Sequence, residues 1–76
     1  MKLNEAIELG KTGRWQDAQV RVSPDNSNQW FVMLRDSHYK YFVLSDNDDR
    51  PIATEEMNRL ADLIRSIGLK EFTVFL

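Results

Sequence analysis

A chain of 76 residues has room for one small domain and no second module, since domains typically span about 100 to 150 residues. Hydrophobic residues make up 42% of the chain and charged residues 29%, a composition that predicts a folded globular protein and excludes a disordered one. The net charge is −2, and the acidic excess lies after residue 45, where four Lys/Arg face seven Asp/Glu. This balance argues against a general affinity for phosphate backbones.

The chain contains no cysteine, so a disulfide framework, a thiolate metal site and a cysteine nucleophile are all excluded. Glu5 and Glu8 interrupt the region where a secretion signal needs an apolar stretch of about 7 to 15 residues. The longest apolar run, residues 30–34, is far shorter than the ~20 residues of a membrane-spanning helix. We therefore expect a cytoplasmic protein that does not enter a membrane.

The first 28 residues predict a short helix, a strand and a turn. Asn4 is the expected N-cap of the helix, and Gly10 is its expected end. Apolar and polar residues alternate over residues 18–23, which is typical of a half-exposed strand. Residues 24–28 combine Pro, Asp, Asn and Ser, and they predict a turn.

Two segments rich in aromatic and β-branched residues, 29–35 and 39–45, predict a β-hairpin. We expect a two-residue turn at Ser37 and His38. This turn sets the cross-strand pairs Leu34 with Tyr41, Val32 with Val43, Met33 with Phe42 and Phe31 with Leu44. The turn contains no Gly, so a longer loop with another register stays open.

The most regular helical spacing of apolar residues follows Thr54, the expected N-cap of a second helix. Glu55 and Glu56 fall in its first turn, where the helix dipole favours anions. The helix is expected to end at Gly68, with Leu69 placed for the apolar contact of a Schellman motif. Its apolar positions are Met57, Leu60, Ala61, Ile64 and Ile67.

Residues 72–76 alternate between apolar and other side chains again and predict a last strand. The order of elements is therefore α-β-β-β-α-β. This order predicts one small α+β domain over residues 1–76, with a mostly antiparallel sheet and the helices packed on one face.

No pattern in the sequence predicts catalysis or a cofactor. His38 is the only histidine, which excludes a site built on two histidines. An EF-hand loop beginning at Asp46 would need Gly where Pro51 stands and Glu where Met57 stands. No carboxylate lies inside an apolar stretch, as general acid–base chemistry would require. We therefore expect a non-enzymatic protein with no cofactor and no metal site.

The predicted hairpin is apolar on both faces, whereas one face of an antiparallel sheet usually alternates to polar. We expect the helices to cover the face that carries Phe31, Met33, Phe42 and Leu44. The opposite face is then the predicted partner-binding surface, made of Trp30, Val32, Leu34, Tyr39, Tyr41 and Val43. Trp and Tyr suit such a surface because each has an apolar body and a polar tip.

Three interpretations of this second face stay open. In the first, the N-terminal segment with Trp15 folds over the face and completes a three-layer core. In the second, which we favour, the face binds a protein partner or a second copy of the chain. In the third, it stacks the bases of single-stranded nucleic acid beside Arg21, Arg35 and Lys40. Four basic residues face three acidic ones between residues 14 and 40, an excess of only +1, which argues against the third.

The acidic residues that follow the hairpin are expected to form a solvated patch that acts as a secondary contact for the partner. This patch comprises Asp46, Asp48, Asp49, Glu55 and Glu56.

Overall fold

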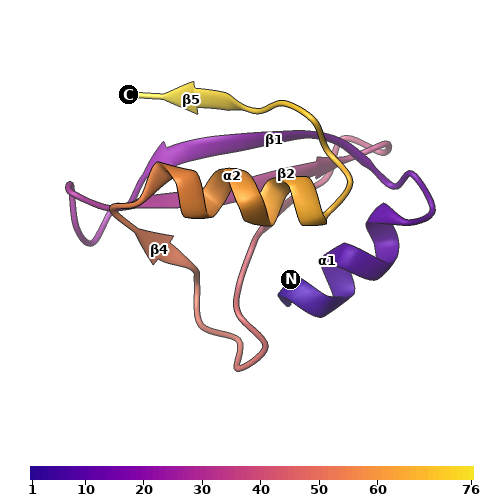
Figure 1. The fold of residues 1–76 in the computed structure, drawn as a ribbon, viewed down its shortest axis with the longest axis horizontal. Helices are drawn as coiled ribbons and strands as arrows, with labels where there is room; N and C mark the ends of the chain where they lie inside the picture. Colours follow the sequence, from indigo (N-terminus) through magenta and orange to yellow (C-terminus); the bar gives the residue numbers. More distant parts are fainter.

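The computed structural model describes all residues from 1 to 76 (Figure 1). Its elements are α1 (Leu3–Gly10), β1 (Trp15–Val22), β2 (Trp30–Asp36), β3 (Tyr41–Val43), β4 (Ala53–Thr54), α2 (Met57–Ser66) and β5 (Thr73–Phe75). The predicted α+β class and the order α-β-β-β-α-β are confirmed. The two-residue strand β4, before α2, is an addition that the sequence pattern did not predict.

The strands form one mixed sheet in the order β3-β2-β1-β5, and β4 pairs with β2 beside β3. The pairs β1–β2, β2–β3 and β2–β4 are antiparallel, whereas β1 and β5 are parallel. Helix α2 lies across one face of this sheet and α1 lies next to the end of α2 (Figure 1). The sheet therefore has one face under the helices and two edges, one formed by β3 and β4 and the other by β5.

The core lies between the sheet and the helices. Alternate residues of β1 and β2 point into it, because successive side chains of a strand lie on opposite faces. Eleven buried apolar residues form this core: Ala6, Trp15, Ala18, Val20, Val32, Leu34, Leu44, Ile52, Leu60, Ile64 and Ile67. Burying one large aliphatic side chain contributes about 1.5 to 3 kcal/mol, so this cluster is the main source of stability.

Helix α1 begins earlier than expected, at Leu3, with Lys2 as its N-cap residue. Asn4 is therefore inside the helix, and the prediction that it caps the helix is wrong. The backbone N–H of Asn4 instead donates to the side-chain Oδ1 of Asn47, 3.1 Å away. A side chain from 43 residues further along the chain thus satisfies one of the free amides at the helix start, a long-range cap that no local pattern signals.

Helix α2 begins later than expected, at Met57, with Glu56 as its N-cap residue. The prediction that Thr54 caps this helix is wrong, because Thr54 belongs to β4 and pairs with Trp30 of β2. The Thr54 hydroxyl still accepts a hydrogen bond from the backbone N–H of Glu56, at 3.1 Å. The residue thus ends the strand and turns the chain into the helix.

The end of α2 is as predicted. Gly68 has a φ of 101°, and its N–H donates to the carbonyl of Arg65 at 3.1 Å. The N–H of Leu69 donates to the carbonyl of Ile64 at 3.3 Å, and the Leu69 side chain packs against the core. These two hydrogen bonds and the apolar contact define a Schellman motif.

The hairpin of β2 and β3 is confirmed, but its predicted register is wrong by one residue. The structure pairs Met33 with Val43, Leu34 with Phe42 and Arg35 with Tyr41. Strand β3 also ends at Val43, since the N–H of Ser45 donates to the carbonyl of Met1 at 2.8 Å. A shift of one residue moves every side chain of one strand to the opposite face of the sheet.

The register follows from the turn, which is longer than two residues because Asp36 organises it. The Asp36 Oδ1 accepts hydrogen bonds from the backbone N–H groups of His38 and Lys40, both at 2.9 Å. Tyr39 adopts a φ of 64°, in the left-handed region. A three-residue loop with its last residue left-handed is a common hairpin connection, and it displaces the pairing from the two-residue register.

The same turn occurs a second time, ten residues later. The Asp46 Oδ1 accepts from the N–H groups of Asp48 and Arg50, at 2.9 and 3.0 Å, and Asp49 also has a φ of 64°. Both turns thus have Asp first, a left-handed residue fourth and a basic residue fifth. Side-chain hydrogen bonds from Asp to the backbone two residues on are a known turn-forming device.

We expect Asp49→Gly to stabilise the protein by about 0.5 to 1 kcal/mol, because the left-handed conformation is unfavourable for any residue with a Cβ. The only ion pair lost is with Lys2, at 3.8 Å between exposed groups, and such a pair contributes little. Thermal unfolding measures the change as a rise in Tm of a few degrees. The control is Asp48→Gly, at a neighbour with no positive φ. Asp48→Gly should not raise Tm. An equal rise in Tm in both variants would contradict the proposed backbone strain at Asp49.

Candidate protein interface

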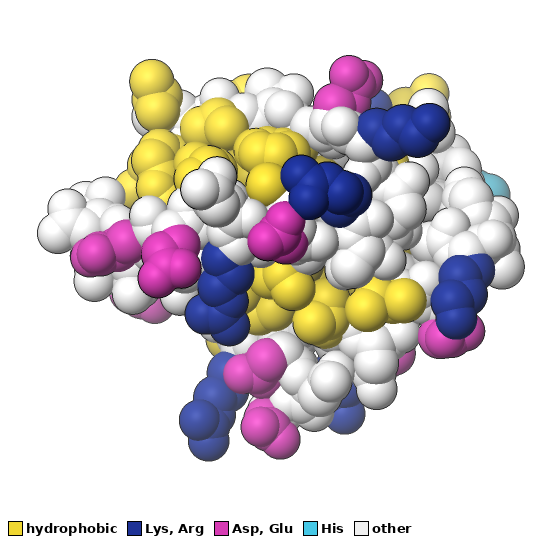
Figure 2. All heavy atoms as spheres, viewed as in Figure 1, with side chains coloured by type: hydrophobic (Ala, Val, Ile, Leu, Met, Phe, Trp, Pro, Cys, Tyr) yellow, Lys and Arg dark blue, Asp and Glu magenta, His cyan; other side chains and the backbone are white.

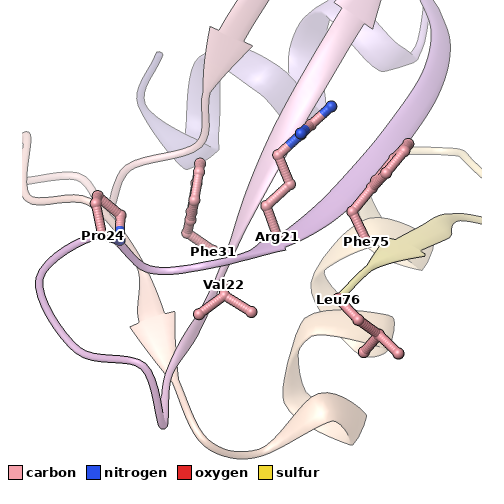
Figure 3. A pocket seen from close by; sticks show the side chains of 6 residues that line it. All are labelled: Arg21, Val22, Pro24, Phe31, Phe75 and Leu76. Carbon is pink, nitrogen blue, oxygen red and sulfur yellow. The ribbon is translucent and has the colours of Figure 1, made fainter.

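The helices cover one face of the sheet and leave the other uncovered; we call the uncovered one the open face. Because the core takes the alternate residues of β1 and β2, the residues between them point to the open face. Figure 3 shows the side chains of Arg21, Phe31 and Phe75 on one side of the strands, whereas Val22 and Leu76 point to the other. The open face comprises Asp17, Gln19, Arg21, Phe31, Met33, Arg35, Tyr41, Val43, Ala53, Thr73 and Phe75.

The strand register arranges these side chains in rows across the sheet. One row runs through Phe75, Arg21, Phe31 and Ala53, from β5 to β4. The next row runs through Thr73, Gln19, Met33 and Val43, from β5 to β3. Both rows carry apolar side chains where a solvated sheet face would carry polar ones.

Arg21 is held in place on the open face without a carboxylate partner. Its Cζ lies 4.2 Å from the centroid of the Phe75 ring, which is within the range of a cation–π contact. Its Nε and Nη2 donate to the Oε1 of Gln19, at 3.1 and 2.8 Å. The Nη1 group makes no hydrogen bond within the chain, so an ordered guanidinium presents a free donor group.

Arg35, two rows along, is neutralised within the chain. Its guanidinium forms an ion pair with Asp17, and its Cζ lies 5.4 Å from the centroid of the Tyr39 ring. The net charge of the open face therefore comes from Arg21. The side chains around Met33 and Val43 are uncharged, and the charge nearest to Val43 is the N-terminal ammonium, which donates to the Val43 carbonyl at 3.2 Å.

Two hollows indent this side of the molecule, and they share a wall formed by Pro24 and Phe31. The first, of about 350 Å³, is lined by Arg21, Val22, Pro24, Phe31, Phe75 and Leu76 (Figure 3). The second, of about 390 Å³, is lined by Ser23, Pro24, Asp25, Gln29, Phe31, Met33, Val43, Pro51 and Ala53. The surface is therefore not flat, and it offers recesses that a partner's side chains can fill.

The predicted partner-binding residues divide between the two faces. Tyr39, Tyr41 and Val43 are exposed by 74, 50 and 38%. Val32 and Leu34 are fully buried, so placing them on the outer face is wrong. The reason is the register, which puts Leu34 opposite Phe42 on the core side.

The apolar residues that reach the open face from β2 are Phe31 and Met33, although the prediction placed them under the helices. Trp30, which was expected outside, instead packs partly buried against the core. The predicted alternation of β2 residues between the two faces is confirmed. The prediction of which face lies outward is wrong. The sequence pattern of β2 does not identify the outward face, because a strand that is apolar on both faces can pack with either face toward the core.

The interpretation in which the N-terminal segment with Trp15 covers the face of Val32 and Leu34 is correct in part, since Ala6 and Trp15 are buried in one core with these two residues. The three-layer core that it included is wrong, because Tyr41 and Val43 on the opposite face are exposed. Trp15 is itself the first residue of β1 and lies buried on the core side. Its indole Nε1 donates to the carbonyl of Ala6 at 2.8 Å, and its ring lies 5.8 Å from that of Phe42 in an edge-to-face arrangement. Trp15 therefore joins α1 to the sheet and leaves the open face uncovered.

The acidic residues after the hairpin lie at the surface. Asp48, Asp49, Glu55 and Glu56 are exposed, whereas Asp46 is half-buried and its Oδ1 is occupied by the turn. No three acidic or histidine side chains come together in a way that could hold a metal ion. Their part in a secondary partner contact stays a prediction.

A buried carboxylate, Asp36, was missed by the sequence reasoning. Its side chain is fully buried and lies 3.5 Å from the Nη2 of Arg14. Hydrogen bonds from the backbone N–H of Lys40 and then of His38, with the charge of Arg14, lower the pKa of Asp36 below its usual value of 3.8, against the opposing effect of burial. The available signal was the Asp that starts each of the two similar turns.

None of the helices has the length and apolarity needed to cross a bilayer. Comparisons of the chain with protein families, curated proteins and solved structures found no match.

Proposed function

We propose that this chain is a non-enzymatic protein-interaction module that associates with a second copy of itself through the open face. The observation that carries the proposal is an apolar surface on a sheet whose other face is already packed; it is formed by the half-buried Phe31 and Met33 and the exposed Tyr41 and Val43. Contiguous exposed apolar surface of this kind marks interaction sites in soluble proteins. The absence of cysteine supports a cytoplasmic setting.

A second copy is the partner that best fits the shape and charge of this face. Sheet faces pack on one another about 10 Å apart, and a two-fold axis supplies an apolar face of the same width. An axis near Met33 and Val43 would bring together the two copies of the uncharged row that contains these residues and keep the two Arg21 side chains apart. Arg35 adds no repulsion, since Asp17 neutralises it.

We expect Val43→Glu to turn a dimer into a folded monomer. A carboxylate at the centre of an apolar contact would be buried without a partner, which should weaken association about a hundredfold. Sedimentation equilibrium gives the mass, and far-UV circular dichroism verifies the fold. Met33→Glu and Tyr41→Glu test the same surface, so that one poorly folded variant does not decide the result.

The matched control is Asn58→Glu, which adds the same charge at an exposed position of α2 and should leave the dimer unchanged. A wild-type protein that stays monomeric at roughly millimolar concentration would contradict self-association. A dimer that survives all three open-face variants would place the interface elsewhere.

A second candidate function is the binding of single-stranded nucleic acid. The observation that favours it is the pair of guanidinium–aromatic contacts, Arg21 with Phe75 and Arg35 with Tyr39. Lys40, next to Tyr39 in the sequence, is exposed and could contact a phosphate. The ion pair with Asp17 neutralises Arg35, which reduces the positive charge available for such binding. A salt titration separates the candidates, because phosphate binding weakens steeply with salt and apolar association does not.

A further inference from the structure

The edge strand β5 has one partner only. It pairs with β1 on one side, and no other strand lies on its second side. Its side chains are uncharged, and Val74, Phe75 and Leu76 are exposed by 39, 39 and 102%. Natural edge strands are often very short, or carry Lys, Pro or a bulge that prevents pairing with another chain. Strand β5 is short, with 3 residues, but it carries none of the other three features.

The two sides of β5 differ in chemistry. On the open-face side, the Arg21 guanidinium lies over the Phe75 ring with its Nη1 group free. On the helix side, Figure 2 shows apolar side chains gathered between α2 and the position of β5 in Figure 1. Val74 and Leu76 lie on this side, since strand residues alternate and Phe75 faces the other way (Figure 3).

We propose that the free edge of β5 binds an extended segment of another protein as an added strand, with an acidic side chain of that segment paired to Arg21. Main-chain hydrogen bonds supply affinity in such strand addition, and side chains at alternate positions supply specificity. The residues before and after the acidic one would point to the helix side, toward Val74 and Leu76. The recognised pattern is therefore apolar, acidic, apolar in an extended conformation.

The charge of Arg21 selects the acidic residue. A half-buried guanidinium with only a neutral amide as polar partner gains a charge-assisted hydrogen bond from a carboxylate. The guanidinium also borders the hollow of about 350 Å³ that Phe31 and Phe75 line, so other protein side chains do not enclose it completely. A lysine in the same place on the segment would meet a like charge instead.

This inference goes beyond the proposed self-association, which concerns the surface around Met33 and Val43. The experiment uses both the wild-type protein and Val43→Glu, so a failure of the dimer does not decide the result. The probe is a fluorescent synthetic peptide, acetyl-Thr-Val-Glu-Val-Thr-amide, and binding is measured by fluorescence anisotropy. Peptides with Lys or Gln in place of Glu are compared with it.

We expect the Glu peptide to bind at least tenfold more tightly than the Lys peptide. Arg21→Gln should remove this preference while leaving the weaker binding of the Gln peptide unchanged, which separates charge recognition from a loss of folding. Arg59→Gln, at an exposed position of α2, is the control and should bind as the wild type does. Equal binding of the Glu and Lys peptides would overturn the assignment of Arg21.

The strand geometry has its own test. Two versions of the Glu peptide carry N-methyl groups on alternate residues, so each has one edge blocked. Strand addition at β5 requires that one version binds like the parent and the other does not, because only one peptide edge faces the protein. Equal binding of both versions, or no binding of the parent peptide at about millimolar concentration, would overturn the proposal.

Discussion

Gly10→Ala is expected to destabilise the protein by roughly 3 kcal/mol, at the upper end of the cost of overpacking, and to lower Tm by about 10 °C or more. A Cβ on Gly10 would lie 1.8 Å from the backbone carbonyl oxygen of Ile67 and 3.5 Å from Cδ1 of Trp15. Backbone cannot rotate away as a side chain can, so the end of α1 would have to move off the end of α2. That movement would also disturb the hydrogen bond from Trp15 to Ala6.

The direction in which Gly10→Ala changes the free energy of unfolding is the test. Gly10 is the last residue of α1, and alanine is favoured over glycine in a helix by up to about 1 kcal/mol, so helix propensity alone predicts stabilisation. Urea unfolding at neutral pH measures the free energy of unfolding for the wild type and the variant. A more stable Gly10→Ala protein would show that α1 does not pack on Ile67 in this way.

Gly13→Ala is the matched control for Gly10. Gly13 has a φ of 74°, and a Cβ there would meet no atom within 4 Å. Only the left-handed backbone would oppose alanine, at a cost of about 1 kcal/mol. The loss at Gly10 should therefore exceed the loss at Gly13.

Local signals were sufficient where the structure depends on neighbours in sequence. The end of α2 followed from Gly68 and Leu69, because a Schellman motif involves only residues within one turn. The strand character of β1 and β2 likewise followed from alternation and β-branched residues. Gly10 shows the limit of such reasoning. The prediction that the first helix ends at Gly10 is confirmed, but no local pattern signals the close approach of Gly10 to Ile67, 57 residues further along the chain.

The open face could be predicted only in part, because its composition depends on one turn. The exposed positions Tyr39, Tyr41 and Val43 were identified correctly as surface residues. The predicted two-residue turn, however, paired Leu34 with Tyr41, whereas the structure pairs Leu34 with Phe42, so the prediction placed Leu34 on the face of the exposed residues of β3. The turn chemistry that decides between the registers is a carboxylate bonded to two backbone amides, and the left-handed residue it requires is Tyr39 rather than a glycine.

Asp36→Asn is expected to lower stability above about pH 5 and to have a smaller effect as the pH falls. The folded protein holds the Asp36 carboxylate with the backbone N–H groups of Lys40 and His38 and with Arg14, so the pKa of Asp36 is lower in the folded than in the unfolded state. A group with a lowered folded pKa stabilises fully above its unfolded pKa, near 3.8, and this contribution is lost as the pH falls through the folded pKa. Asparagine keeps an oxygen acceptor but cannot ionise.

The measurement is the free energy of unfolding of wild type and variant between pH 7 and pH 2.5. The difference between them should be constant down to about pH 5 and should then shrink toward acid pH. Asp46→Asn is the control, because Asp46 forms the same turn with a less buried carboxylate and without a nearby arginine in an ion pair. A difference for Asp36→Asn that does not change with pH would show that the charge of this carboxylate is not what stabilises the turn.

Loss of the Asp36 carboxylate should also change the open face, because the Asp36 turn sets the hairpin register. Without two backbone amides bound to the carboxylate, a two-residue turn becomes a competitor, and its register would turn Tyr41 and Val43 toward the core. Asp36→Ala, which removes the acceptor altogether, should therefore weaken self-association as well as stability, although Asp36 itself is buried and cannot touch a partner. If Asp36→Ala destabilised the chain yet dimerised like the wild type, the register would be held by the packing of Leu34 and Phe42 rather than by the turn.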